Sequence, residues 1–169
     1  CNIAGASHVG LKQFEAAIIS FKQALKIKPD DADVYNNIGN VLEQKGDLEA
    51  AIDSYKQAIK IKPNYTEAYN NMGAVLSKKG DLNSALDNFK KALKINPDYA
   101  EAYNNLGAVL NKKGDLEAAI DSYKQALRIA PDNAESYYNM GISLNKKGDA
   151  KAAIDSYKQA LKIKPDYAE

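Results

Sequence analysis

Apolar and small residues recur along this chain with the period of an α-helix, in short blocks separated by glycine or proline. In the segment 32–65, the first block places such residues at i, i+3, i+4 and i+7, on one stripe of a helix. This stripe consists of Tyr35, Ile38, Gly39 and Leu42. The same spacing continues over three turns from Leu48 to Ile59. The pattern predicts two amphipathic helices in this segment.

The polar residues between the blocks carry the signals that end and start helices. Gly46 can adopt the left-handed conformation that ends a helix, and Asp47 can cap the next one. Pro63 follows the second block and prevents its continuation. After it, Asn64 and Glu67 have the spacing of a capping box. The same box recurs as Asp98 with Glu101 and as Asp132 with Glu135.

These signals repeat every 34 residues along the chain. All five prolines keep this period, as Pro29, Pro63, Pro97, Pro131 and Pro165, and so do nine of the ten glycines. A fixed period of this length indicates one supersecondary unit that packs on copies of itself. We therefore predict an all-α solenoid that is a single array over 1–169. Its segments are a truncated first repeat at 1–31, repeats at 32–65, 66–99, 100–133 and 134–167, and the start of another at 168–169.

The spacing of large and small residues within each unit resembles the tetratricopeptide repeat family. In the unit 100–133, the matching positions are Tyr103, Leu106, Gly107, Leu110, Ala119, Tyr123, Ala126 and Pro131. The first unit departs from this pattern: Cys1, Ala4 and His8 stand where larger residues are usual, and Lys12 replaces the turn glycine. The resemblance implies a right-handed superhelix whose first helices line a concave groove.

Two consecutive polar residues in each first helix face away from the stacking stripe, and the resemblance implies that they line the groove. The candidate peptide-binding residues are Asn36, Asn37, Asn40, Asn70, Asn71, Asn104, Asn105, Tyr138, Asn139 and Ile142. A carboxamide both donates and accepts, so one asparagine per repeat can hold an extended peptide by its backbone, in a ladder of Asn37, Asn71, Asn105 and Asn139. Such a ladder is similar to that of the O-linked N-acetylglucosamine transferases. The alternative is that duplication copied solvated residues without a role.

Other side chains near the groove narrow the class of ligand. Tyr138 and Ile142 make its C-terminal end more apolar, which suits either an aromatic or aliphatic ligand side chain or packing against a further repeat. Lysine pairs end three first helices, at 78–79, 112–113 and 146–147, where they complement the helix dipole. An acidic ligand at this edge stays open as an alternative. Some family members bind the acidic tails of chaperones through Lys and Arg residues in the groove. This chain has asparagine or tyrosine at those positions, which argues against such a ligand.

Composition excludes several functional classes. A net charge of +1 gives no basis for binding nucleic acid, and no apolar stretch approaches the roughly 18 residues that span a bilayer. His8 is the only histidine and Cys1 the only cysteine, so we expect no catalytic residues, no metal site and no cofactor. A lone thiol and the lack of a targeting segment favour a cytoplasmic protein. Lipidation of Cys1 is a weaker alternative.

These observations predict a scaffold for protein–protein interaction that binds a peptide segment and is not an enzyme. One alternative is the substrate-recruiting region of a larger glycosyltransferase or sulfotransferase. Another is a module that assembles end to end, because the last helix, from Ala152 to Ile163, carries an apolar face with no polar cap.

Overall fold

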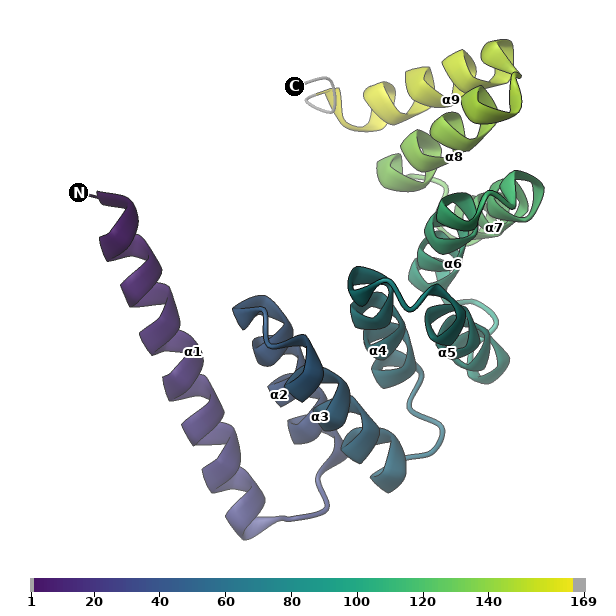
Figure 1. The fold of residues 1–169 in the computed structure, drawn as a ribbon. Helices are drawn as coiled ribbons and strands as arrows, with labels where there is room; N and C mark the ends of the chain where they lie inside the picture. Colours follow the sequence, from purple (N-terminus) through teal and green to yellow (C-terminus); the bar gives the residue numbers. More distant parts are fainter. Residues whose placement is uncertain (1, 166–169) are drawn as a thin grey trace. The chain divides into compact units, whose positions relative to one another are not determined.

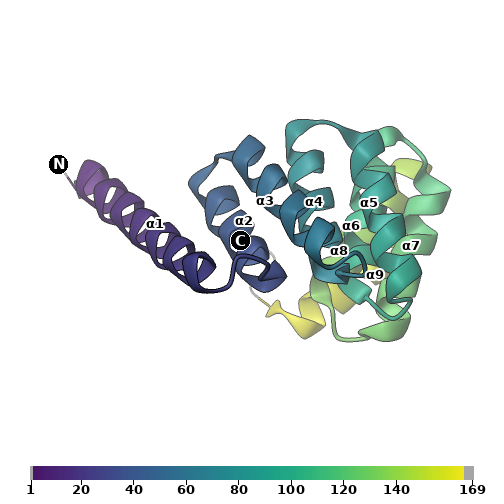
Figure 2. The same cartoon turned by 90° about the horizontal axis from the view of Figure 1, so that it is seen from below.

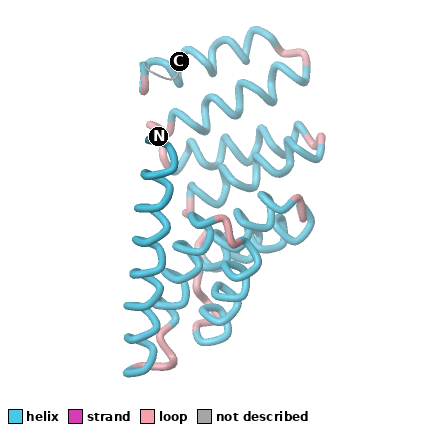
Figure 3. The backbone as a smooth tube through the Cα atoms, turned by 60° about the vertical axis from the view of Figure 1, so that its left-hand side comes forward, coloured by secondary structure: helices cyan, strands magenta, loops and turns pink. Residues whose placement is uncertain are grey.

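The computed structural model describes the backbone of residues 2–165 and the side chains of residues 13–165. This part of the chain consists of α-helices joined by short turns and contains no strand, as predicted (Figures 1 and 3). The helices are α1 (Asn2–Ile27), α2 (Ala32–Lys45), α3 (Leu48–Ile61), α4 (Thr66–Lys79), α5 (Leu82–Ile95), α6 (Ala100–Lys113), α7 (Leu116–Ile129), α8 (Ala134–Lys147) and α9 (Ala150–Ile163). The predicted start of another repeat lies outside the described residues.

The chain divides into two compact units, Cys1–Gly80 and Asp81–Glu169, which we call unit 1 and unit 2. In unit 1, α2 and α3 form a helical hairpin, with α1 packed on α2 and α4 packed on α3. In unit 2, α6 pairs with α7 and α8 with α9, while α5 packs on α6 and α7 on α8. First helices also touch directly, α2 with α4 and α6 with α8. These contacts place the candidate asparagines on neighbouring helices.

The turns inside the hairpins confirm the predicted signals. Gly46 has φ 86°, in the left-handed region, and its N–H donates to carbonyl groups of the last turn of α2. The Asp47 carboxylate then accepts a hydrogen bond from the Ala50 N–H, 3.4 Å away, and caps α3. Gly80, Gly114 and Gly148 have the same left-handed backbone.

The capping boxes predicted after each proline are wrong by one residue. The N-cap residues are Tyr65, Tyr99 and Asn133, directly after the predicted caps. Pro63 and Asn64 instead fill a turn that is closed by a 3.1 Å bond from the Tyr65 N–H to the Lys62 carbonyl. The carboxylates of Glu67 and Glu135 are thereby free to act elsewhere.

The predicted close approach of the two helices in a hairpin is confirmed at Gly39. The Tyr55 side chain is fully buried, and its ring covers Gly39: a Cβ atom there would lie only 2.7 Å from Cδ1 of the ring. Ala51 and Ala58, on the same helix as Tyr55, are also fully buried. The glycine costs up to about 1 kcal/mol of helix propensity. Burial of a tyrosine ring against its backbone offsets that cost.

The first repeat differs from the others because α1 runs unbroken through the position of the expected turn (Figures 1 and 2). At that position Lys12 stands where the other repeats have a left-handed glycine. A lysine favours continued helix, so the local signal for a turn is missing. The side chains of Cys1, Ala4 and His8 lie outside the described residues.

Candidate functional site on the first helices

The structure separates the two asparagines that the sequence had placed side by side in the groove. The first of each pair is buried: Asn36 and Asn70 are each 1% exposed, and Asn104 is 5% exposed. The prediction that these three side chains face a ligand is therefore wrong. A helix turns by about 100° per residue, so only one of two neighbours can face outward fully.

Two of the buried asparagines, Asn36 and Asn104, have a structural role that we did not predict, because each binds the next first helix of its unit. Asn36 Nδ2 donates to Glu67 Oε1 at 3.3 Å in unit 1, and Asn104 Nδ2 donates to Glu135 Oε1 at 3.2 Å in unit 2. Ser136 also donates to Asn104, with 3.1 Å between oxygens. The Asn–Glu pairing recurs two repeats apart, which is the sequence signal that could have revealed it.

The second asparagine of each pair stays at the surface. Asn37 is exposed, and Asn71, Asn105 and Asn139 are partly exposed. Asn71 Nδ2 donates to Asn36 Oδ1 at 3.3 Å and to Asn40 Oδ1 at 3.1 Å, so it is held by the preceding repeat. Among the side chains of residues 13–165, the carboxamides of Asn37 and Asn139 have no hydrogen-bond partner. Those two groups are available to a ligand.

Next to these surface asparagines in unit 1, a group of polar side chains is joined by hydrogen bonds and an ion pair. We call Asn40, Glu43, Tyr55, Asn71 and Lys78 the inner site of unit 1. The Tyr55 hydroxyl donates to Asn40 Oδ1 at 2.8 Å and lies 3.5 Å from Glu43 Oε2, while the Lys78 ammonium contacts Glu43 Oε1 at 2.5 Å. Burial, reinforced by the negative charge of Glu43, raises the pKa of the Tyr55 hydroxyl. The candidate residue Asn40 is thus held inside a hydrogen-bonded cluster.

The equivalent place in unit 2 is hollow. A cavity of about 200 Å³ lies there, and we call it the inner site of unit 2; it is lined by Ala108, Asn111, Lys112, Tyr123, Asn139 and Ile142. Two of these, Asn139 and Ile142, are predicted site residues. Asn111, Lys112 and Tyr123 were not among our candidates. Burial raises the pKa of the Tyr123 hydroxyl, and the charge of Glu135 adds to that effect.

Tyr138 faces a different neighbour from the one we predicted. It is 40% exposed, and its ring lies against that of Tyr157 on α9, with centroids 5.7 Å apart and planes tilted by 52°. It occupies the position of the buried Asn104, one repeat further on. Tyr138 does not line the inner site of unit 2.

The lysines at the ends of first helices reach neighbouring helices. Lys79 pairs with Glu49 at 2.8 Å and Lys147 with Glu117 at 3.2 Å, and each lysine lowers the pKa of its partner carboxyl. Lys146 instead donates to the neutral Asn111, with 2.5 Å from Nζ to Oδ1. Exposed ion pairs of this kind contribute little to stability.

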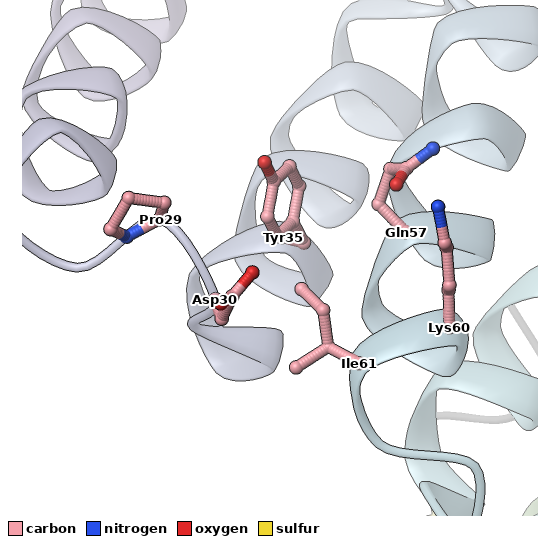
Figure 4. Close-up of a pocket in the computed structure, with 6 residues that line it drawn as sticks. All are labelled: Pro29, Asp30, Tyr35, Gln57, Lys60 and Ile61. Atoms are coloured by element: carbon pink, nitrogen blue, oxygen red, sulfur yellow. The ribbon is translucent and has the colours of Figure 1, made fainter.

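Another hollow lies in unit 1, beside the loop after α1 (Figure 4). It has a volume of about 380 Å³ and is lined by Pro29, Asp30, Tyr35, Gln57, Lys60 and Ile61. In unit 2, Asp98 and Arg128 occupy the places of Asp30 and Lys60, and their charged groups are 3.9 Å apart. This hollow is open and is lined mainly by polar residues, and none of the predicted peptide-binding residues lines it.

Within the described part of the chain, no group of histidine, cysteine or acidic side chains is arranged to hold a metal ion. None of the described helices is both long and apolar enough to cross a membrane. The exposed face of the first helices carries the carboxamides of Asn37 and Asn139 and, in unit 2, the hollow of the inner site.

Comparisons with known proteins agree with the helical fold. The chain is similar to a crystal structure of MamA, with 28% identity, a TM-score of 0.81 and coverage of 92% of this chain and 91% of that one. A second MamA structure gives 27% identity, a TM-score of 0.79 and coverage of 97% and 90%. MamA 41-end from Desulfovibrio magneticus RS-1 shares the fold at 23% identity, with a TM-score of 0.80 and coverage of 98% and 95%.

No curated protein sequence matches the chain. Family comparisons do: residues 7–46 and 39–80 match the family described as TPR repeat. Residues 65–132 and 98–166 match the one described as tetratricopeptide repeat. Together these matches cover most of the chain, which therefore belongs to the tetratricopeptide repeat family.

Proposed function

We propose that this protein is a non-catalytic scaffold whose first-helix faces bind extended peptide segments of a partner protein. Repeats of this family generally mediate protein–protein interactions. The observation that carries the proposal is the state of the surface carboxamides: Asn37 in unit 1 and Asn139 in unit 2 have no partner among the described side chains. Each can donate to a peptide carbonyl and accept from a peptide N–H at once.

The neighbouring asparagines extend this row within each unit. Asn71 has the position of Asn37 on the next first helix of unit 1, and Asn105 has the position of Asn139 on the preceding first helix of unit 2; the paired first helices are in contact. Asn71 uses its N–H groups within the protein, so its contribution is to order the row. Binding through backbone groups would tolerate many ligand sequences.

The test is to remove the free carboxamides from the whole 169-residue chain. Asn37→Ala and Asn139→Ala should each weaken binding to an array of capped peptides of about ten residues by two- to ten-fold, since each loses hydrogen bonds worth about 0.5–1.5 kcal/mol. The melting temperature should not change, because neither group bonds within the described part of the protein. Gln159→Ala removes an exposed carboxamide from α9 and is the matched control. Equal binding by all three variants would refute the proposal.

Self-association is a second candidate, favoured by the apolar surface of α9. Ile154 is 53% exposed, and Leu161 and Ile163 are 39% and 38% exposed. Exposed apolar patches often mark interfaces between proteins. Self-association predicts a scattering mass that rises with concentration and that falls back in Ile154→Lys. A constant monomer mass would reject it.

The third candidate is the substrate-recruiting region of a larger glycosyltransferase or sulfotransferase. The resemblance of the surface asparagine row to that of O-linked N-acetylglucosamine transferases motivates it. The reading frame around the coding segment tests it directly. A frame without a transferase domain would dismiss this candidate.

A further inference from the structure

The inner site of unit 2 is lined by both apolar and polar side chains. Ala108 and Ile142 stand where unit 1 has Asn40 and Ala74. Because Ala108 lacks the carboxamide of Asn40, no side chain fills the space in front of the Tyr123 ring, and about 200 Å³ stays open. A hollow of this size accommodates a branched aliphatic side chain.

A cation lies at the rim without an acidic partner. The Lys146 ammonium donates to Asn111 Oδ1, while Asn111 Nδ2 donates to the buried hydroxyl of Ser143. Within the described part of the chain, Lys146 forms no ion pair. Asn111 therefore connects a lysine to the hollow but leaves the positive charge uncompensated.

The inner site of unit 1 shows which group compensates this charge. Two repeats earlier, Glu43 replaces Asn111 and Lys78 replaces Lys146. There the Glu43 carboxylate accepts from the Lys78 ammonium at 2.5 Å and lies 3.5 Å from the Tyr55 hydroxyl. The inner site of unit 1 thus contains the Glu43 carboxylate, whereas Asn111 occupies that position in the inner site of unit 2.

We infer that the inner site of unit 2 binds a peptide segment that carries an aliphatic side chain and, nearby on the same side, a carboxylate. The aliphatic group fills the hollow between Ala108 and Ile142, and the carboxylate pairs with the Lys146 ammonium, as Glu43 pairs with Lys78 in unit 1. Asn139 holds the peptide backbone beside them. This inference rests on the proposed function and specifies the ligand chemistry.

The probe is a fluorescein-labelled, capped peptide of about ten glycine and serine residues that contains one leucine and one aspartate separated by one glycine. In an extended peptide, residues two apart point to the same side, so both groups reach the site together. Control peptides carry asparagine in place of aspartate, or glycine in place of leucine. We expect the full peptide to bind at least about five-fold more tightly than either control at low salt, and less so at high salt.

Two variants and one control test whether the peptide binds at the inner site of unit 2. Asn111→Glu installs the unit 1 carboxylate beside Lys146 and should abolish the preference for aspartate over asparagine. Gln159→Glu adds the same charge to an exposed position on α9 and should leave the preference intact. Ala108→Asn, which copies Asn40 of unit 1, should abolish the preference for leucine over glycine.

The outcomes distinguish the inference from the proposed function beneath it. Equal binding of all three peptides would overturn the inference while leaving peptide binding by the scaffold in place. A preference for aspartate that survives in Asn111→Glu would also overturn it. Binding of no peptide at all would overturn both. Circular dichroism confirms that each variant stays helical, and Lys146→Gln provides an independent removal of the cation.

Discussion

The two inner sites occupy equivalent positions in their repeats, but they differ in how far their polar side chains are paired with one another. In unit 1, Asn40 accepts from Tyr55 and Asn71, while Glu43 pairs with Lys78 and lies 3.5 Å from the Tyr55 hydroxyl, so each of these side chains has a partner. In unit 2, Ala108 and Asn111 replace Asn40 and Glu43, a hollow is open, and Lys146 pairs with no carboxylate of the described residues. Repetition of the fold therefore does not repeat the chemistry. Three differing positions, at which Ala108, Asn111 and Ile142 replace Asn40, Glu43 and Ala74, distinguish the open hollow from the closed polar cluster.

The largest expected difference concerns the glycines beneath the two tyrosines. A Cβ at Gly39 would lie 2.7 Å from Tyr55 Cδ1, and one at Gly107 would lie 3.0 Å from Tyr123 Cδ1. Gly39→Ala should lower the free energy of unfolding by about 1–3 kcal/mol through overpacking, and Gly107→Ala by less. The closer approach of the Tyr55 ring leaves less room for an added methyl group at Gly39 than at Gly107. Urea denaturation of both variants measures the difference. A larger loss in Gly107→Ala would contradict this ordering.

The two asparagines of each first helix should separate stability from binding. Asn36→Ala should destabilise the protein by about 1–3 kcal/mol, because it removes a buried amide and leaves Asn71 and Glu67 without one partner each. Asn104→Ala should behave alike in unit 2, since it loses Glu135 and Ser136. Asn37→Ala should stay within about 0.5 kcal/mol of the parent. Thermal denaturation of the three variants tests this shared part of the two units; equal stability of all three would refute it.

Alkaline pH should destabilise both units through their tyrosines. Burial raises the pKa of Tyr55 and of Tyr123, so the folded protein holds them neutral while the unfolded chain ionises near pH 10. Stability should be constant below about pH 10 and then fall by up to about 1.4 kcal/mol per pH unit for each tyrosine. Denaturant titrations between pH 8 and 11 measure the slope. Tyr55→Phe and Tyr123→Phe should each make it shallower, and an unchanged slope in both would contradict the burial argument.

The smallest expected effect lies at the start of α2. Asp31 caps this helix by accepting from the N–H groups of Asp33 and Val34, and its hydrogen bond with Lys28 and the bond from Val34 hold its pKa below the ordinary 3.8. The stabilisation is present above about pH 4 and is lost as the pH falls through the lowered pKa. The corresponding cap of α6 in unit 2 is Tyr99, which makes no side-chain cap hydrogen bond.

Hydrogen exchange of the Asp33 and Val34 amides should therefore show less protection at low pH in the parent chain. Asp31→Asn should remove that pH dependence, because asparagine caps without titrating. The first amides of α6 serve as the internal control. Similar acid sensitivity at both helix starts would show that the whole hairpin, and not the Asp31 cap, responds.

The sequence by itself determined the helices, the left-handed turn at Gly46, the cap at Asp47 and the close packing of Gly39 against the second helix. These features follow from backbone preferences and from residues a few positions apart, which any single repeat contains. Family membership follows from the same spacing. The caps at Tyr65 and Tyr99 were missed because the turn after each proline takes up one more residue than the capping-box spacing suggests.

Only the tertiary structure decided which polar side chains are buried between repeats and which are exposed. Asn36 and Asn37 are equally polar in the sequence, yet one is bonded to Glu67 on the next repeat and the other is exposed. The hollow of unit 2 likewise depends on Ala108, Asn111 and Ile142, which come from two different helices. Their meeting depends on the rotation of each helix and on the distance between repeats. Both are set by packing across repeats, which no single repeat specifies.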